Sequence, residues 1–151
     1  MTKRTLLGGL ALAALSMTGC STVCGEFCPY LIEGAAFELG GNERDYDYAC
    51  AKFSFHNGSD KDVSSFTVSF MLYDSEGNNP FVGSNNVVER VDGNVPSGAS
   101  TAVLIPMDDY LTIVPDEPYK IDFMYVRKIE YADGSEWTDP FGMYSAREVF
   151  E

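Results

Sequence analysis

The single histidine and the carboxylates are the residues of this 151-residue chain that could carry out acid–base chemistry. His56 lies in a Gly/Ser/Asp turn, and nearby Ser54, Ser59 and Asp60 do not form a catalytic triad merely by being adjacent in sequence. The chain has no G-x-S-x-G nucleophile motif and no glycine-rich phosphate loop. A glycosidase-type pair would need two carboxylates facing each other across a cleft, and no pattern indicates one. The sequence therefore predicts no catalytic residue.

Acidic loops could also bind calcium, because carboxylate oxygens are its preferred ligands. Segment 74–78 is superficially similar to an EF-hand loop, but Gly77 comes too early and no glutamate closes the loop. Solvated loops are the simpler interpretation, so we predict no metal and no cofactor. The other candidate oxygen ligands are Glu43, Asp45, Asp47, Asp108 and Asp109.

Composition and charge limit the classes of partner. Apolar residues make up 45% of the chain, which is typical of one globular domain. With 10 Lys and Arg against 23 Asp and Glu, the net charge is −13. Nucleic-acid binding needs clustered Lys and Arg, and adsorption to anionic lipid needs a basic patch, so the sequence argues against both.

The first twenty residues have the pattern of an export signal. Lys3 and Arg4 form a positive n-region, and residues 6–15 form an uncharged apolar stretch. This stretch is about half the length of a membrane-spanning helix, so a permanent transmembrane segment is not predicted. The segment ends in Ser16-Met17-Thr18-Gly19-Cys20.

This ending resembles the lipobox of bacterial lipoproteins, with Met17 in place of the usual leucine. The resemblance implies cleavage before Cys20, lipidation of its sulfur and acylation of the new N-terminus. Two or more acyl chains anchor a protein stably. In Gram-negative bacteria, Ser21 in place of aspartate favours the outer membrane over the inner one. An ordinary cleaved signal peptide with an incidental cysteine is the alternative.

Three other cysteines would lie in an oxidising compartment, where disulfides persist: Cys24, Cys28 and Cys50. All three pairings are open, and we favour Cys28–Cys50 because closing this loop would stabilise the fold by about 3 kcal/mol. A metal site made of these cysteines and His56 matches no common zinc spacing.

Alternation of apolar and polar residues dominates the rest of the chain and is typical of half-buried strands. The clearest runs are 49–55, 65–72 and 119–131, and weaker candidates are 35–39, 86–91 and 101–105. In residues 49–55 the alternation turns Cys50 away from the core. Asp133-Gly134 lies between two apolar segments and predicts a hairpin. The side chains expected in the core include Phe66, Phe70, Ile121, Phe123 and Trp137.

These runs predict an all-β fold, an antiparallel immunoglobulin-like β-sandwich of about seven to eight strands. An up-and-down barrel is the alternative. We expect a signal-peptide helix over residues 1–19, a lipid-anchored tether with cysteines over 20–34, the sandwich over 35–138 and a C-terminal tail over 139–151. Ser145-Ala146-Arg147-Glu148 fits a capping box that would begin a short helical turn in this tail.

The motif Phe70-Met71-Leu72-Tyr73-Asp74 resembles the signature of the FxLYD domain, which occurs in exported bacterial proteins and lipoproteins. The turn at 57–59, Glu76-Gly77 and Pro96-Ser97-Gly98 fit its context, and the similarity covers about residues 50–105. The resemblance implies a β-sandwich and brings no activity and no catalytic residues.

Aromatic residues in irregular segments are candidates for contact with a partner, because tyrosine is favoured at interfaces. Tyr110, Phe141 and Tyr144 could form an exposed patch, or the C-terminal tail could pack back onto the sandwich. We therefore expect a non-catalytic, lipid-anchored envelope protein that binds a protein or an extracellular ligand, facing the periplasm or the cell surface. The alternatives are a structural or assembly accessory of the envelope and, less favoured, a small metal-dependent hydrolase.

Overall fold

The computed structural model describes residues 28–40 and 48–145. They form seven strands and one short 3₁₀ turn, η1, and the described part of the chain contains no helix that could span a membrane. The elements are β1 (Tyr30–Leu39), β2 (Ala49–Asn57), β3 (Val63–Tyr73), β4 (Asn86–Val95), β5 (Ser100–Pro106), η1 (Asp108–Tyr110), β6 (Lys120–Tyr131) and β7 (Glu136–Thr138).

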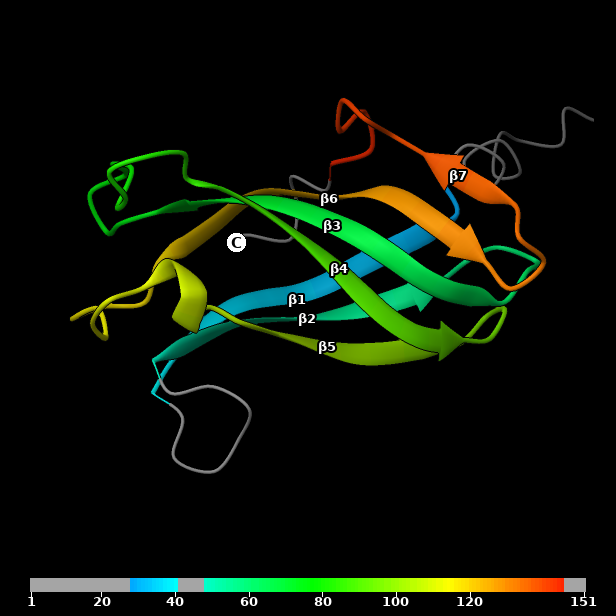
Figure 1. The fold of residues 1–151 in the computed structure, drawn as a ribbon, viewed down its shortest axis with the longest axis horizontal. Helices are drawn as coiled ribbons and strands as arrows, with labels where there is room; N and C mark the ends of the chain where they lie inside the picture. Colours follow the sequence, from blue (N-terminus) through cyan, green and yellow to red (C-terminus); the bar gives the residue numbers. More distant parts are fainter. Residues whose placement is uncertain (1–27, 41–47, 146–151) are drawn as a thin grey trace, which may run out of the picture.

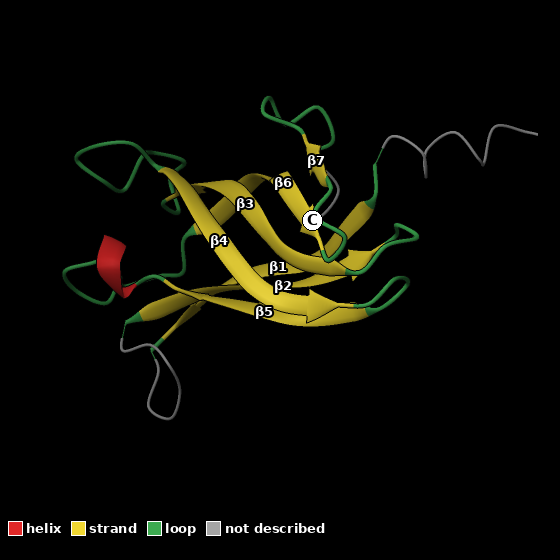
Figure 2. Ribbon diagram, turned by 45° about the vertical axis from the view of Figure 1, so that its right-hand side comes forward, coloured by secondary structure: helices red, strands yellow, loops and turns green. Residues whose placement is uncertain are grey.

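The strands form two antiparallel sheets that face each other (Figures 1 and 2). One sheet has the order β1-β2-β5 and the other has the order β4-β3-β6-β7. The chain crosses between the sheets after β2, after β4 and after β5, as in immunoglobulin-like sandwiches. The predicted all-β sandwich is confirmed, the weaker strand candidates lie in β1, β4 and β5, and Gly134 lies in the predicted hairpin turn between β6 and β7.

The core lies between the sheets and follows the predicted alternation in β2 and β3. Phe53 and Phe55 of β2 are buried, and Phe55 stacks on Phe66 of β3 with ring centroids 4.1 Å apart. Cys50 is also buried, but it does not belong to the core that its neighbours Ala49 and Ala51 enter, so its predicted outward position is not contradicted. At this end β2 lies between β1 and the segment after β5, whose Met107 N–H donates to the Ala49 carbonyl, so both sides of β2 are enclosed.

Two β-bulges in β6 change the predicted alternation. The partner of Val68 in β3 is Val126 whereas that of Thr67 is Lys128, and a second irregularity lies opposite Phe70. Each extra residue reverses which side chains face inward. Phe123, predicted in the core, is therefore 42% exposed with φ of 49°, while Met124 beside it is fully buried.

The other expected core residues lie in or against the core. Phe66, Phe70 and Ile121 are buried. Trp137 of β7 is partly buried and packs against the core, where its ring meets the ring of Tyr30 edge-on.

Asn57 connects the two sheets at one end of the sandwich. Its buried side-chain amide donates to the carbonyls of Lys61 and of Val95, the last residue of β4, at 2.8 and 3.0 Å. Its amide oxygen accepts hydrogen bonds from the backbone N–H and the hydroxyl of Ser59. The Asn57 backbone also bonds to Gly98 and Ala99. The Asn57 side chain thus joins the turn at 58–62 to the end of β4, and Ser97 adds hydrogen bonds from the turn at 96–99 to Asp62 and Ser59.

Tyr30 makes a second hydrogen bond between the sheets at the same end. It is the register partner of Asn57, and its hydroxyl accepts the N–H of Val126 in β6 at 3.0 Å. This N–H adjoins one of the bulges, where the regular ladder is interrupted. Burial raises the pKa of Tyr30 well above its usual value. The hydroxyl satisfies a buried donor that β3 leaves without a partner.

The position of β1 corrects two predictions. Because β1 begins at Tyr30, the sandwich starts before residue 35 and the tether is shorter than expected. Cys28 lies beside the Asn57 end, whereas Cys50 pairs with Glu38 at the other end of β1. From residue 50 to residue 57, β2 spans about 23 Å. A disulfide needs Cα atoms within about 7 Å, so the structure excludes the favoured Cys28–Cys50 bond.

The signal peptide, Cys20, Cys24 and the capping box from residue 146 onward lie outside the described residues.

Asn57→Ala should lower the free energy of unfolding by about 3 kcal/mol, because the buried Val95 carbonyl loses its donor and the turn at 58–62 loses its hydrogen bonds to the Asn57 amide. This corresponds to a melting temperature lower by roughly 10 °C for a domain of this size. Asn79→Ala is the matched control, since Asn79 makes similar loop hydrogen bonds at an exposed position. Equal losses in the two variants would contradict the role given to Asn57.

Tyr30→Phe should cost about 1–2 kcal/mol, because the buried Val126 N–H loses its acceptor while the ring packing remains. Urea unfolding of the variant measures this difference. Tyr73→Phe removes a hydroxyl that, within the described residues, donates to the sulfur of Met71, and it should change stability by less than about 0.5 kcal/mol.

Candidate binding site at the loop end opposite Asn57

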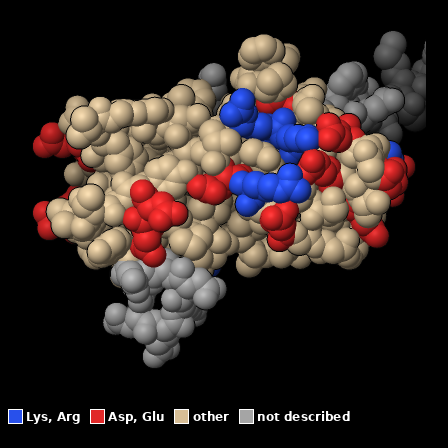
Figure 3. All heavy atoms as spheres, in the orientation of Figure 1, with Lys and Arg blue, Asp and Glu red and all other residues tan. Residues whose placement is uncertain are grey.

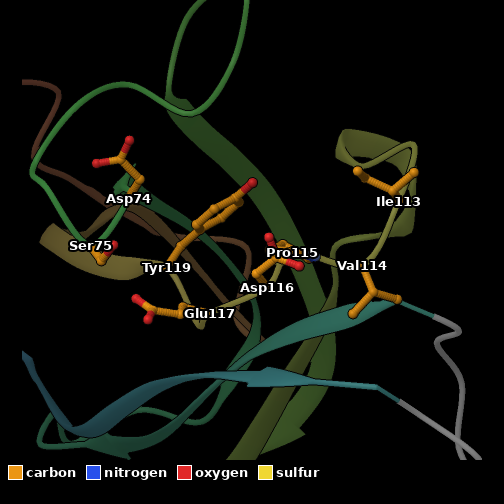
Figure 4. Close-up of a pocket in the computed structure, with 8 residues that line it drawn as sticks. All are labelled: Asp74, Ser75, Ile113, Val114, Pro115, Asp116, Glu117 and Tyr119. Atoms are coloured by element: carbon orange, nitrogen blue, oxygen red, sulfur yellow. The ribbon is translucent and has the colours of Figure 1, made fainter.

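A pocket of about 470 Å³ lies at the end of the sandwich opposite Asn57. It is formed where the β3–β4 loop meets the segment that joins β5 to β6 (Figures 1 and 4). We call it the distal pocket. It is lined by Asp74, Ser75, Ile113, Val114, Pro115, Asp116, Glu117 and Tyr119.

Asp74 ends the FxLYD-like motif and fixes the loop on one side of the distal pocket. One oxygen of its carboxylate accepts the backbone N–H groups of Glu76 and Asn78 at 3.0 and 2.8 Å. The Asn78 N–H, followed by the other loop donors, lowers the pKa of Asp74. The carboxylate therefore stays ionised and holds the loop at neutral pH.

Tyr119 directly precedes β6 and lies between the two sides of the distal pocket (Figure 4). Its ring packs on Phe37 of β1 with centroids 5.1 Å apart and meets Phe81 of the β3–β4 loop at 6.0 Å. Burial, together with the charge of Asp74, raises the pKa of Tyr119. Its hydroxyl therefore stays protonated and can donate a hydrogen bond.

The remaining wall combines apolar and acidic side chains within five consecutive residues. Ile113 is 73% and Val114 is 43% exposed, although such side chains are usually buried. Asp116 and Glu117 follow directly after Pro115. Within the described part of the chain, neither they nor Asp74 form an ion pair with a lysine or arginine. The distal pocket thus has one apolar wall and three carboxylates without cationic partners.

The outer face of the four-stranded sheet provides a contrast, because its basic side chains lie directly beside acidic ones (Figure 3). Glu130 of β6 contacts the Ser65 hydroxyl, Arg90 and Lys128, and Lys128 also pairs with Glu136 at 2.8 Å. The hydrogen bond from Ser65, followed by the two basic groups, lowers the pKa of Glu130 to about 2. This face therefore offers few charges to a ligand.

The structure does not bring the predicted aromatic patch together. Tyr110 of η1 donates its hydroxyl to Glu89 of β4, and burial followed by Glu89 raises the pKa of Tyr110 to about 12. Tyr144 packs on Trp137 of β7, which lies at the opposite edge of the sheet from β4. Phe141 is 86% exposed.

The C-terminal tail accounts for the position of Tyr144. The Asp139 N–H donates to the Arg127 carbonyl, and the Asp139 carboxylate accepts the N–H groups of Met143 and Tyr144. Gly142 packs so closely on the Tyr125 ring that an added Cβ would lie 2.9 Å from it. The alternative prediction, a tail that packs back onto the sandwich, is correct for residues 139–145.

The other candidates from the sequence have structural contacts or lie outside the described residues. His56 Nδ1 lies 2.9 Å from the Ser100 hydroxyl on the neighbouring strand β5. Asp108 accepts the Tyr48 N–H at 2.7 Å, and Glu43, Asp45 and Asp47 are not described. Among residues 28–40 and 48–145, no group of three or more His, Cys, Asp or Glu residues could hold a metal ion.

Sequence reasoning did not identify the distal pocket as a site. It considered Asp74 as the end of a motif and as part of an EF-hand-like segment, and it did not connect this residue with Asp116 and Glu117. The available signal was an apolar Ile113-Val114-Pro115 run placed directly before two carboxylates in a segment without alternation.

Comparisons with known proteins support the fold. A crystal structure of a hypothetical protein from Peptoclostridium difficile 630 is similar, with a TM-score of 0.54 and 12% identity over 74% of this chain and 87% of that chain. At this identity the similarity concerns the fold alone. No protein-family model and no curated protein matches the chain.

Glu130→Gln should reduce the acid sensitivity of folding. A carboxyl whose pKa is lowered in the folded state stabilises the fold above its ordinary pKa of 4.5, and this contribution disappears as the pH falls toward 2. The variant should therefore be less stable than wild type at pH 7, and the difference should close between about pH 5 and pH 2. Melting temperatures of wild type and Glu130→Gln, measured from pH 7 to pH 2, test this prediction. The control is Glu33→Gln, which changes an exposed glutamate. A difference that persists at pH 2 would contradict the pairing.

Proposed function

We propose that this chain is a lipid-anchored lipoprotein of the bacterial envelope. In this proposal its β-sandwich is a non-catalytic binding module that presents the distal pocket away from the membrane. The observation that carries the proposal is the direction of β1, which begins at the Asn57 end and runs toward the end that holds the pocket (Figure 1).

The lipobox-like sequence supports the anchor and defines its place. Residues 21–29 connect Cys20 to β1 and can reach at most about 30 Å when extended. The eleven residues of β3 run between the two ends of the sandwich and span about 36 Å. An anchor at Cys20 would therefore hold the Asn57 end toward the bilayer and the distal pocket away from it.

The roles of the FxLYD-like residues support a binding module rather than an enzyme. Phe70 and Leu72 are fully buried, and Asp74 shapes the β3–β4 loop. The turn at 57–59 and the turn at 96–98 contact each other through Asn57 and Ser97, whose hydroxyl donates to the Ser59 carbonyl. Phe70 and Leu72 thus build the scaffold, whereas Asp74 shapes one side of the distal pocket, to which we assign recognition.

Cys20→Ala should abolish lipidation, since the lipobox provides a single thiol for the thioether. The measurement is incorporation of labelled palmitate and the size of the mature form after expression in the native host. Cys24→Ala is the matched control and should retain the label. Palmitate on the Cys20→Ala protein, or none on wild type, would refute the anchor. Protease treatment of intact cells, with a periplasmic protein as control, then separates a surface module from a periplasmic accessory.

A further inference from the structure

We infer that the distal pocket binds a basic segment of a partner protein, with a lysine or arginine side chain between the carboxylates and an apolar neighbour against Ile113 and Val114. This inference rests on the proposed binding function and specifies the chemistry of the partner. It is carried by two features of one surface, an exposed apolar wall and carboxylates that form no ion pair within the described residues, where the nearby Lys120 ammonium bonds instead to the Ser75 carbonyl.

The charges of the distal pocket favour a cation. Asp74, Asp116 and Glu117 lie on different sides of the pocket around Tyr119 (Figure 4). Their arrangement does not form a cluster that could hold a metal ion, because no such group occurs in the described part of the chain. A bare divalent ion needs oxygens converging at about 2.0–2.6 Å, whereas a guanidinium or ammonium group on a long side chain can reach carboxylates that are more widely spaced.

The apolar wall requires more than a simple cation. Ile113 and Val114 are exposed beside the carboxylates, and a lysine or arginine stem can bury its methylene groups on such a surface while its charged head reaches the acids. The pocket volume of about 470 Å³ falls in the range that small ligands or a few side chains fill. The side of the Tyr119 ring completes the wall.

Other occupants fit less well. A second copy of this chain carries the same net charge of −13 and would be repelled. Nucleic acids and anionic lipid surfaces are disfavoured at three carboxylates for the same reason. A basic protein segment is attracted over a longer range by the net charge of the whole molecule, which speeds association at low ionic strength.

The test uses the full mature chain in micelles of a neutral detergent and three labelled five-residue peptides. One peptide alternates lysine with leucine, the second replaces leucine with serine, and the third replaces lysine with glutamate. Fluorescence anisotropy should show saturable binding of the lysine–leucine peptide, with at least tenfold weaker binding of the other two. Affinity for the lysine–leucine peptide should fall as salt is raised.

Variants locate the binding surface. The double variant Asp116→Asn, Glu117→Gln should weaken binding of the lysine–leucine peptide at least tenfold. Ile113→Ser should weaken binding of the same peptide at least threefold. The control Glu33→Gln with Asp60→Asn removes the same charge at exposed positions outside the pocket, and Met143→Ser removes an equally exposed apolar side chain. Both controls should stay within twofold of wild type.

Equal losses in the pocket and control variants would overturn the inference, because binding would then reflect overall charge. Absence of saturable binding, or preference for the glutamate–leucine peptide, would also overturn it. These outcomes are independent of palmitate on Cys20, which tests the proposed anchor. Lipidation without lysine–leucine binding would therefore reject the basic partner while leaving the lipoprotein assignment standing.

Discussion

Hydrogen bonds between the two sheets at one end of the sandwich fix the position of one sheet relative to the other, and the rest of the structure depends on this position. Tyr30 and Asn57 are register partners in one sheet, and each bonds to the backbone of the other sheet, at Val126 and Val95. Two flat sheets packed by apolar contacts alone can slide, whereas buried polar groups with fixed geometry set one relative position. The relative position of the sheets is therefore set at the Asn57 end, away from the distal pocket.

The Tyr30 hydroxyl compensates for a hydrogen bond that a bulge of β6 interrupts. A bulge interrupts the ladder to β3 beside Val126, and the Tyr30 hydroxyl accepts the N–H of that residue. The same strand turns Phe123 outward with a positive φ, and the Asp122 carboxylate accepts the Phe123 N–H. β6 also pairs with β7 only over Lys128–Glu130, so the bulges lie along the part of the strand that has one strand neighbour.

The fold was largely predictable because strand alternation and turn chemistry are local signals. They identified β2 and β3 and the hairpin that ends at β7. The alternation failed in β6, because a bulge adds one residue without any mark in the sequence. The disulfide prediction failed for a related reason, since the cost of closing a loop says nothing about which ends of two strands Cys28 and Cys50 occupy. The distal pocket was not predictable, because Asp74 and Glu117 meet only once β3 and β6 pair.

The direction of β1 has a mechanical consequence. The N-terminal segment enters at the Asn57 end, and the distal pocket lies at the other end, so tension between an anchor and a bound partner would run lengthwise along the strands. Interstrand hydrogen bonds lie perpendicular to the strands, so such a load shears the β1–β2 ladder as a whole instead of opening it one bond at a time. The hydrogen bonds between β1 and β2, from Tyr30 to Leu39, would share this force. A partner could then pull on the pocket without peeling β1 from its sheet.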